Sequence, residues 1–304
     1  MDYVLETKGL GKSYRRFQAL NDLNMRVPKG SIYGFVGKNG AGKTTLIRII
    51  CGLQEPTAGS YTLYGCENGS RVMARARRRM GAVVESPAIY PDMTARQNLE
   101  QQYRVLGLPS MSGIDELLKL VGLSDTGKKK AGNFSLGMRQ RLGIAVALCG
   151  GPDFLVLDEP VNGLDPEGIV ELRELILRLN RQEGITILIS SHILDELSRL
   201  ATHYGFIDRG SMVRELSAAE LERLSRKAVH VRVSDGKTLL RVCDGLGLSC
   251  ELGDGNEADI YGEVSVTALV EALSREGCIL YSLTQRDEGL ESFYMNLLGG
   301  EHRA

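Results

Sequence analysis

Short apolar runs alternate with helix-like patterns from residue 1 to about residue 215. The runs contain few polar positions, which is typical of parallel strands buried on both faces, and they lie at residues 31–36, 154–157 and 186–190. A helical pattern follows each run, at residues 43–51, 167–183 and 193–201. A strand-like segment at residues 3–7 opens the region. This alternation predicts an α/β fold in which helices pack on a parallel sheet.

The pattern changes from about residue 220 onward. Val229, Val231 and Val233 alternate with polar residues, which predicts a half-buried strand. Further short strands are predicted at residues 248–252, 259–262 and 278–283, and helices at residues 237–245, 266–275 and 290–298. The order β-α-β-β-α-β suggests a small ferredoxin-like α+β domain. We therefore expect a large domain at residues 1–217 and a small C-terminal accessory domain at residues 221–304.

The composition narrows the possible partners. The chain has 304 residues and a formal net charge of -1, so we expect no nucleic-acid partner. Residues 1–8 carry two acids and no apolar run, unlike a secretory signal. No stretch approaches the ~18–20 apolar residues that span a bilayer. Six cysteines lack metal-ligand spacing and are expected to be reduced core thiols of a cytosolic protein, at positions 51, 66, 149, 243, 250 and 278.

A glycine-rich segment follows the run at residues 31–36 and fits the phosphate-loop pattern G-x-x-x-x-G-K-[ST]. It reads Gly37, Lys38, Asn39, Gly40, Ala41, Gly42, Lys43, Thr44, with Thr45 directly after it. We expect the three glycines to let successive N–H groups turn toward one point, at the positive end of the following helix. Lys43 would supply charge for the β- and γ-phosphates, and the Thr44 hydroxyl would ligate Mg²⁺. Alone, such a loop indicates only nucleoside triphosphate binding.

Two acids, Asp158 and Glu159, directly follow the apolar run at residues 154–157. Ligands of open α/β sheets bind at the carboxyl ends of the strands, where these acids lie. Asp158 is therefore predicted to hold Mg²⁺ through water, and Glu159 to accept a proton from an attacking water. A strand that ends in a solvated acidic turn is the alternative when this segment is taken alone.

A third segment, residues 134–141, begins a helix predicted to run to Leu148. Ser135 is a natural N-cap, and a small residue, the glycine Gly137 and a helix N-terminus together make an anion site. A protein with one phosphate loop would not need this second site within the same chain. An ordinary capped helix is the commoner meaning of such a segment in isolation.

With these motifs in this order, the chain resembles the ATP-binding subunits of ABC transporters. Residues 134–141 are similar to the family's signature motif, although Phe134, Leu136 and Met138 depart from it. Leu136 replaces a flexible position, so its backbone should not need positive φ. The resemblance implies a P-loop ABC ATPase domain with a helical subdomain at about residues 86–150.

The resemblance also assigns roles to single residues. Gly163-Leu164-Asp165-Pro166 resembles the family's loop that crosses the dimer interface. Asp165 is therefore expected to be one of the ATP-binding residues. His192 resembles the switch histidine that contacts the γ-phosphate, and with Lys43 and Glu159 it completes the catalytic set. Tyr14 resembles the aromatic residue that stacks on adenine, with Phe17 as the second candidate. A surface tyrosine and a structural histidine are the plainer alternatives.

One departure concerns the end of the strand predicted at residues 81–84. The family has a glutamine there that touches Mg²⁺, whereas this chain has Glu85. We expect Glu85 to be a metal ligand together with Thr44 and Asp158. The alternative is that Glu85 is simply the solvated end of a strand. Residues 85–91 and the variant signature resemble the bacterial transporters that export bacitracin or give immunity to lantibiotics. A run of arginines lies just before this strand, at Arg71, Arg75, Arg77, Arg78 and Arg79. We expect it to form a solvated helix face; contact with lipid headgroups or the permease is the minor alternative.

The resemblance implies an ATP hydrolase that uses ATP and Mg²⁺. Two subunits, expected to be identical, would pack head to tail with Ser135 of one capping the ATP on Lys43 of the other. They would power a separate membrane permease from the cytoplasmic face of the membrane and export a peptide antibiotic or similar amphiphile. The alternatives are an ABC ATPase acting on the ribosome or DNA, and a module that binds ATP without turnover; Glu159 argues against the second.

Overall fold

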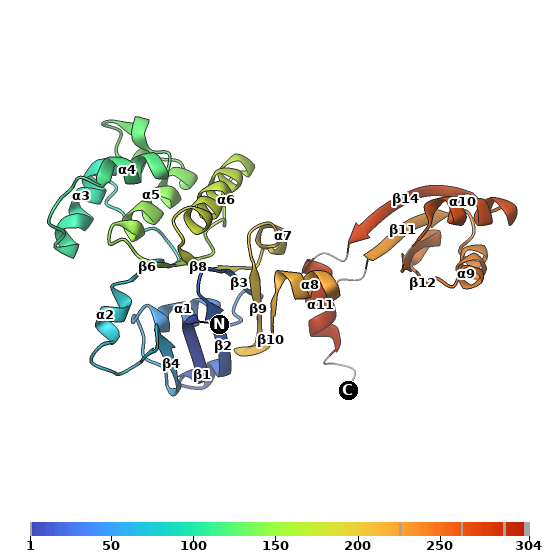
Figure 1. The fold of residues 1–304 in the computed structure, drawn as a ribbon, viewed down its shortest axis with the longest axis horizontal. Helices are drawn as coiled ribbons and strands as arrows, with labels where there is room; N and C mark the ends of the chain where they lie inside the picture. The colour runs from blue at the N-terminus through green and yellow to red at the C-terminus, as the bar shows by residue number, and fades with distance from the viewer. Residues whose placement is uncertain (1, 225–226, 263, 288–289, 301–304) are drawn as a thin grey trace. The chain divides into compact units, whose positions relative to one another are not determined.

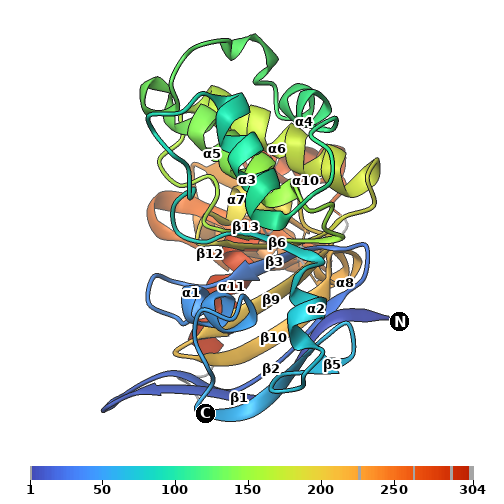
Figure 2. The ribbon, with the colours of Figure 1, turned by 90° about the vertical axis from the view of Figure 1, so that its left-hand side faces the viewer.

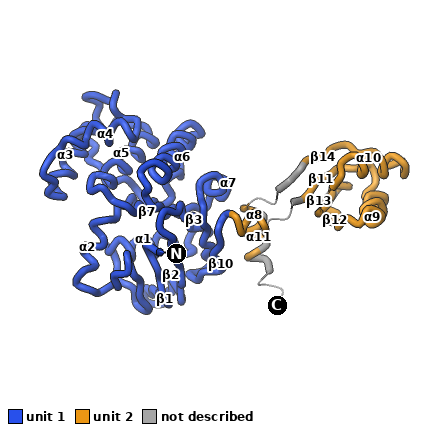
Figure 3. The backbone as a smooth tube through the Cα atoms, viewed as in Figure 1, with its two compact units in different colours: residues 1–218 blue, residues 219–304 orange. Residues whose placement is uncertain are grey.

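The computed structural model describes residues 2–224, 227–262, 264–287 and 290–300. The chain divides into two compact units, residues 1–218 and residues 219–304 (Figure 3). Each unit has a hydrophobic core of its own.

A six-stranded sheet forms the centre of the first unit, in the order β10-β9-β3-β8-β7-β6. Its strands are β3 (Ile32–Val36), β6 (Met80–Val83), β7 (Phe154–Asp158), β8 (Thr186–Ser191), β9 (His203–Asp208) and β10 (Ser211–Ser217). All neighbours pair in parallel except β9 and β10. The three predicted apolar runs are strands β3, β7 and β8, so the parallel sheet is confirmed.

A second, antiparallel sheet of the first unit has the order β2-β1-β4-β5. Its strands are β1 (Tyr3–Tyr14), β2 (Phe17–Pro28), β4 (Ala58–Leu63) and β5 (Cys66–Glu67). Helix α1 (Lys43–Ile50) lies between this sheet and the central sheet (Figure 2). One continuous core joins the three layers through fully buried side chains such as Leu10, Leu46 and Val156. The sequence pattern predicted only the first part of β1 and missed the rest of this sheet.

The other face of the central sheet is covered by helices (Figures 1 and 2). These are α3 (Ala95–Leu106), α4 (Ile114–Leu120), α5 (Leu136–Leu148) and α6 (Pro166–Arg181). The first three lie in sequence between β6 and β7, with 3-10 turns at Ser124–Thr126 and Ala131–Asn133. Helix α7 (Leu194–Ser198) is shorter than predicted because the N–H groups of Leu200 and Ala201 both donate to Leu197 O, which closes the helix.

The arginine run begins just before α2 (Met73–Arg77) and ends just after it, and two of its members make specific contacts. Arg77 is half-buried and donates to Ile50 O at 3.3 Å and to the Tyr61 hydroxyl at 2.5 Å. Arg79 pairs with Asp153 and lies 3.9 Å above the ring of Tyr64. The expected solvated face is therefore wrong for Arg77, whereas Arg79 remains 50% exposed while it makes these contacts.

The second unit contains a four-stranded antiparallel sheet in the order β12-β13-β11-β14. Its elements are α8 (Ala218–Leu224), β11 (Lys227–Val233), α9 (Gly236–Gly245), β12 (Ser249–Leu252), a 3-10 turn at Asp254–Asn256, β13 (Glu257–Tyr261), α10 (Val266–Arg275), β14 (Leu280–Asp287) and α11 (Leu290–Gly300). The predicted order β-α-β-β-α-β and the closing helix are confirmed. Val231, Ile260 and Leu269 are fully buried in its core. Across the described residues, no helix has the length and apolarity needed to cross a bilayer.

Candidate functional site

The glycine-rich loop connects β3 to α1 and lies at the carboxyl edge of the central sheet. Gly40 and Gly42 adopt φ of 83° and 111°, values that other residues rarely take. Gly37 differs from the expectation, because its φ is not positive. A Cβ atom at Gly37 would lie 2.7 Å from Ile207 on β9, so this glycine allows close packing rather than an unusual turn.

Glu159 lies between Lys43 and His192. Its Oε1 is 3.1 Å from Lys43 Nζ, and its Oε2 is 2.7 Å from His192 Nδ1. Lys43 is 5% exposed and also donates to Gly37 O at 2.5 Å and Lys38 O at 3.2 Å. The structure thus brings together the three residues that the sequence predicted to be catalytic.

The two acids at the end of β7 are held by Ser190 of the neighbouring strand β8. The Ser190 hydroxyl donates to Asp158 Oδ1 at 2.5 Å, and Asp158 is 2% exposed. The Glu159 N–H donates to Ser190 O at 3.1 Å and to its Oγ at 3.0 Å. Glu159 has a φ of 48°, a conformation that costs about 1–3 kcal/mol and tends to occur at functional sites. Sequence reasoning missed Ser190, although its position at the end of an adjacent parallel strand was a usable signal.

A cavity of about 250 Å³ opens over the loop. It is lined by Phe17, Ala19, Asn39, Gly40, Gly42, Lys43, Thr44, Thr45 and Glu159. Phe17 is 61% exposed, as expected of a ring that could take a planar ligand. The hydroxyl of Tyr14 donates to Gln54, and Lys12 Nζ lies 5.3 Å from the Tyr14 ring centroid. Of the two aromatic candidates, Phe17 lines this cavity and Tyr14 does not.

The variant signature segment lies beside the loop that carries Asp165. Ser135 caps α5 by accepting from Met138 N at 3.2 Å, and Leu136 is helical, without positive φ. Asp165 caps α6 by accepting from Gly168 N at 3.1 Å. A Cβ atom at Gly163 would lie 3.2 Å from a methyl group of Leu136. The two segments therefore contact each other within one chain.

Glu85 follows β6 and forms an ion pair with Arg48 of α1. The side chains of Arg48 and Glu85 are 36% and 55% exposed. Glu85 has a φ of 61° and stands in a tight turn in which Ser86 N donates to Val84 O at 2.7 Å. Sequence reasoning did not find Arg48, because a partner 37 residues away carries no local signal.

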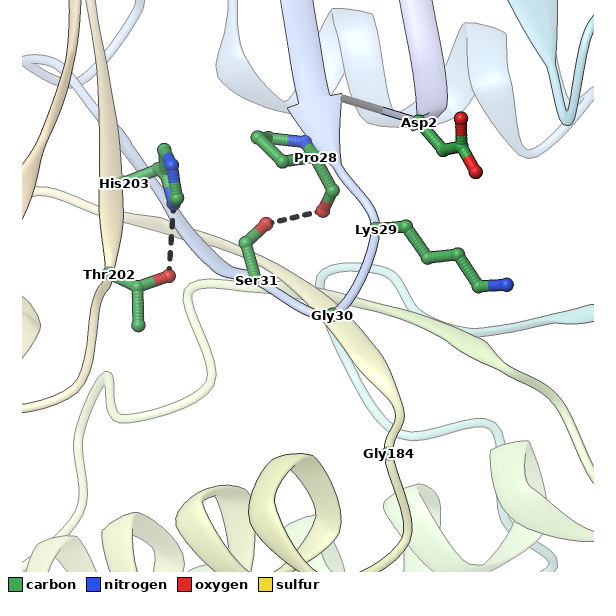
Figure 4. Close-up of a pocket in the computed structure, with 8 residues that line it drawn as sticks. All are labelled: Asp2, Pro28, Lys29, Gly30, Ser31, Gly184, Thr202 and His203. Atoms are coloured by element: carbon green, nitrogen blue, oxygen red, sulfur yellow. Dashed lines mark hydrogen bonds between the residues drawn. The ribbon is translucent and has the colours of Figure 1, made fainter.

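Two other cavities of the first unit lie away from this edge. One of about 590 Å³ is shown in Figure 4 and is lined by Asp2, Pro28, Lys29, Gly30, Ser31, Gly184, Thr202 and His203. Its residues precede or begin β3, β8 and β9, so it lies at the amino edge of the sheet, opposite the glycine-rich loop. The other, of about 690 Å³, lies between β6 and helices α3 and α5.

The cysteines are free thiols. Burial raises the pKa of Cys51, Cys149 and Cys243 to about 12, so these thiols stay protonated at neutral pH. In the described part of the chain, no cluster of three or more histidine, cysteine, aspartate or glutamate side chains could hold a metal ion.

A phosphate loop between a strand and a helix, two acids at the end of β7, and a separate helix capped by Ser135 are together the features of an ATP-binding cassette. The sequence model of the ABC transporter family matches residues 20–162, and the chain belongs to the family of ABC transporter ATP-binding proteins. The bacitracin transport ATP-binding protein BcrA of Bacillus licheniformis is 39% identical over 303 residues, 99% of both chains. The lantibiotic transport ATP-binding protein SrtF of Streptococcus pyogenes is 45% identical over 212 residues, 70% of this chain and 90% of SrtF.

Solved structures agree with this assignment. The dimeric structure of the ATP-binding cassette MJ0796 bound to ADP and Pi is 25% identical, with a TM-score of 0.64, and covers 70% of this chain and 98% of that chain. The chain is therefore the ATP-binding, ATP-hydrolysing subunit of an ABC transporter, as the sequence predicted.

Proposed function

We propose that the chain works as half of a head-to-tail homodimer that hydrolyses ATP with Mg²⁺ and drives a separate membrane permease. The observation that carries this proposal is the placement of Glu159 between Lys43 and His192, beside the loop cavity. A carboxylate there can accept the proton of an attacking water. His192 orients that carboxylate, and Lys43 binds the β- and γ-phosphates. Because phosphate oxygens compete with Glu159 for the Lys43 ammonium group, nucleotide binding frees Glu159 for the water.

The oxygen atoms near the loop fit Mg²⁺. Thr44 supplies a hydroxyl and Asp158 a buried carboxylate, and we propose Glu85 as the third protein group of this site. Mg²⁺ is usually held by one or two carboxylates together with phosphates and water, so no cage of protein ligands is needed. Bound there, the ion would offset the charge of the phosphates.

A second subunit would complete each ATP site. Ser135 and Gly137 stand at the positive end of α5. In a two-fold dimer the same surface of each subunit meets the other, so two identical ATP sites form between them. Asp165 lies on the adjoining loop and would face the partner. The dimeric MJ0796 structure supports this arrangement.

The permease would bind at the 690 Å³ cavity, on the cytoplasmic face of the membrane. The cavity is lined by apolar side chains of α3 and by Arg77 and Arg78, which suits an amphipathic segment. Val105, within it, is 67% exposed. The names of BcrA and SrtF support a peptide antibiotic or similar amphiphile as the exported cargo. Their similarity also disfavours an ATPase acting on the ribosome or DNA.

We further propose that residues 221–304 form a ferredoxin-like accessory domain beside an ATP-binding domain at residues 1–217. The strand order β12-β13-β11-β14 and the helices α9 and α10, each of which connects two strands, support this assignment.

The test of the proposed function is Glu159→Gln. The variant should bind ATP as the parent does and lose hydrolysis by ~10²–10⁴-fold, or about 3–5 kcal/mol in the barrier. ATP should also convert it to a stable dimer, measured by size-exclusion chromatography with light scattering. Glu167→Gln, an exposed acid in the first turn of α6, is the matched control and should hydrolyse ATP normally. Hydrolysis by Glu159→Gln at the parent rate would show that another group is the base.

A further inference from the structure

Arg48 and Glu85 join two segments that flank the ATP site. Arg48 Nη2 donates to Glu85 Oε1. Arg48 lies four residues after Thr44 in α1, and residues with this spacing share one face of a helix. The arginine therefore stands one turn along from the hydroxyl proposed to bind Mg²⁺.

Glu85 occupies a position equivalent to that of Glu159 on the neighbouring strand. In the parallel pair of β6 and β7, Val83 is opposite Leu157, so Glu85 and Glu159 each lie two residues beyond this pair. Both acids have positive φ, 61° and 48°. Such backbone conformations persist only where the surroundings enforce them, and they occur preferentially at functional sites. Glu85 is thus held at the same edge of the sheet as Asp158 and Glu159.

Three carboxylates at one edge, beside a triphosphate, repel each other unless cations offset them. Lys43 is already paired with Glu159. Arg48 is the cation that contacts Glu85, and among the described residues this ion pair uses only Oε1 of the carboxylate. The second oxygen is available to a metal ion or its water.

We infer that Arg48 is a positioning residue for nucleotide binding: it holds the Glu85 carboxylate at the Mg²⁺ edge of the site. This inference rests on the proposed function, because it takes Glu85 as part of the metal site. A neutral glutamine at position 85 would not need the arginine. An ion pair as exposed as this one contributes little to stability, so its effect on nucleotide binding is separable from folding.

The test is a double-mutant cycle on the full chain with Arg48→Ala, Glu85→Gln and the double variant. The probe is the non-hydrolysable analogue AMP-PNP, whose affinity is measured by calorimetry as Mg²⁺ is raised from zero. Arg48→Ala should raise the Mg²⁺ concentration for half-maximal tightening about tenfold, within the usual range of coupling energies. In the background of the Glu85→Gln variant, the same substitution should change it less than about twofold.

Two control variants isolate the role of the ion pair. Arg48→Lys keeps the charge but loses the planar fork, so it should give an intermediate shift. Arg96→Ala breaks the pair with Asp115, which has side chains 46% and 74% exposed, and should leave the Mg²⁺ requirement unchanged.

Three outcomes would overturn the inference. An equal shift in both backgrounds would mean that Arg48 acts only as a distant charge, because such effects add. No shift would make the pair an ordinary surface contact. A lower Mg²⁺ requirement would mean that Arg48 keeps Glu85 away from the metal. Each of these can occur while Glu159→Gln behaves as expected, so failure here is distinct from failure of the proposed function.

Discussion

At the scale of single residues, the two aromatic candidates for stacking on adenine have different surroundings. Phe17 lines the cavity, whereas Tyr14 is engaged with Gln54. Stacking of a base on an aromatic ring contributes about 1–3 kcal/mol. Phe17→Ala should therefore weaken ATP binding by about 5–150-fold, and Tyr14→Ala by less than about threefold. Calorimetric titration with ATP measures both.

Phe17→Tyr serves as the control, since it keeps an aromatic ring and should bind ATP nearly as the parent does. The reverse ranking, with Tyr14→Ala the weaker binder, would restore Tyr14 as the stacking residue that the sequence first suggested.

The sequence pointed to the residues that we propose carry the chemistry but not to how they meet. Lys43, Asp158 and Glu159 follow from local motifs with fixed spacing. The contact between His192 and Glu159 joins residues 33 positions apart and depends on β7 and β8 being neighbours in the sheet. Arg77 illustrates the same limit, because its burial against Tyr61 follows from the packing of α2 on the antiparallel sheet.

At the scale of elements, the loop between β3 and α1 depends on close packing at Gly37. A methyl group there would meet Ile207 on β9 at 2.7 Å, from both its side chain and its carbonyl. Overpacking typically costs about 1–3 kcal/mol, so Gly37→Ala should lower the free energy of unfolding by that amount. It should also weaken ATP binding, because the loop must move away from β9. Chemical denaturation and ATP titration measure the two effects.

Gly30→Ala is the matched control for that substitution. Gly30 has a φ of 78° and open space around its missing side chain, at the opposite edge of the sheet. Its replacement should cost about 1–2 kcal/mol of stability from backbone strain alone and leave ATP affinity unchanged. If Gly37→Ala binds ATP as tightly as Gly30→Ala does, the packing of this loop does not control the site.

The antiparallel sheet escaped sequence-based prediction for a related reason. Strand β1 pairs with β2 through several register shifts, including one between Thr7 and Leu10, and these interrupt the two-residue alternation that marks a strand. Gly59 of β4 has a φ of 68° and lies so close to Gly9 that a side chain would collide with its carbonyl. Glycines that permit such close approach read as turns in the sequence.

At the scale of the whole molecule, the change of pattern near residue 220 predicted where the chain divides into two compact units, at residue 218. Alternating valines and a clear turn signal gave the element order of the second unit. The pairing of β11 with both β13 and β14 could not be read, because strand order depends on contacts across the whole domain. The sequence carries even less information on assembly, since a site shared between two subunits looks incomplete in either one.

The proposed shared site gives the last prediction, a complementation experiment. Ser135→Arg should abolish hydrolysis and leave ATP binding in its own loop intact, because Ser135 is proposed to act on the partner's ATP. Lys43→Ala should lose ATP binding and hydrolysis. In an equal mixture half of the dimers pair one chain of each kind, and each such dimer keeps one complete site. If sites work independently, about a quarter of the parent activity should return.

The control is Thr94→Ala, because Ser135 also caps α5 and its replacement removes that cap. Thr94→Ala removes the cap of α3 instead, and the loss of a cap costs about 1 kcal/mol of stability. Parent-level hydrolysis by Ser135→Arg alone would show that each chain completes its own site. No recovery in mixed dimers verified by two different tags would contradict a shared site whose two copies work independently.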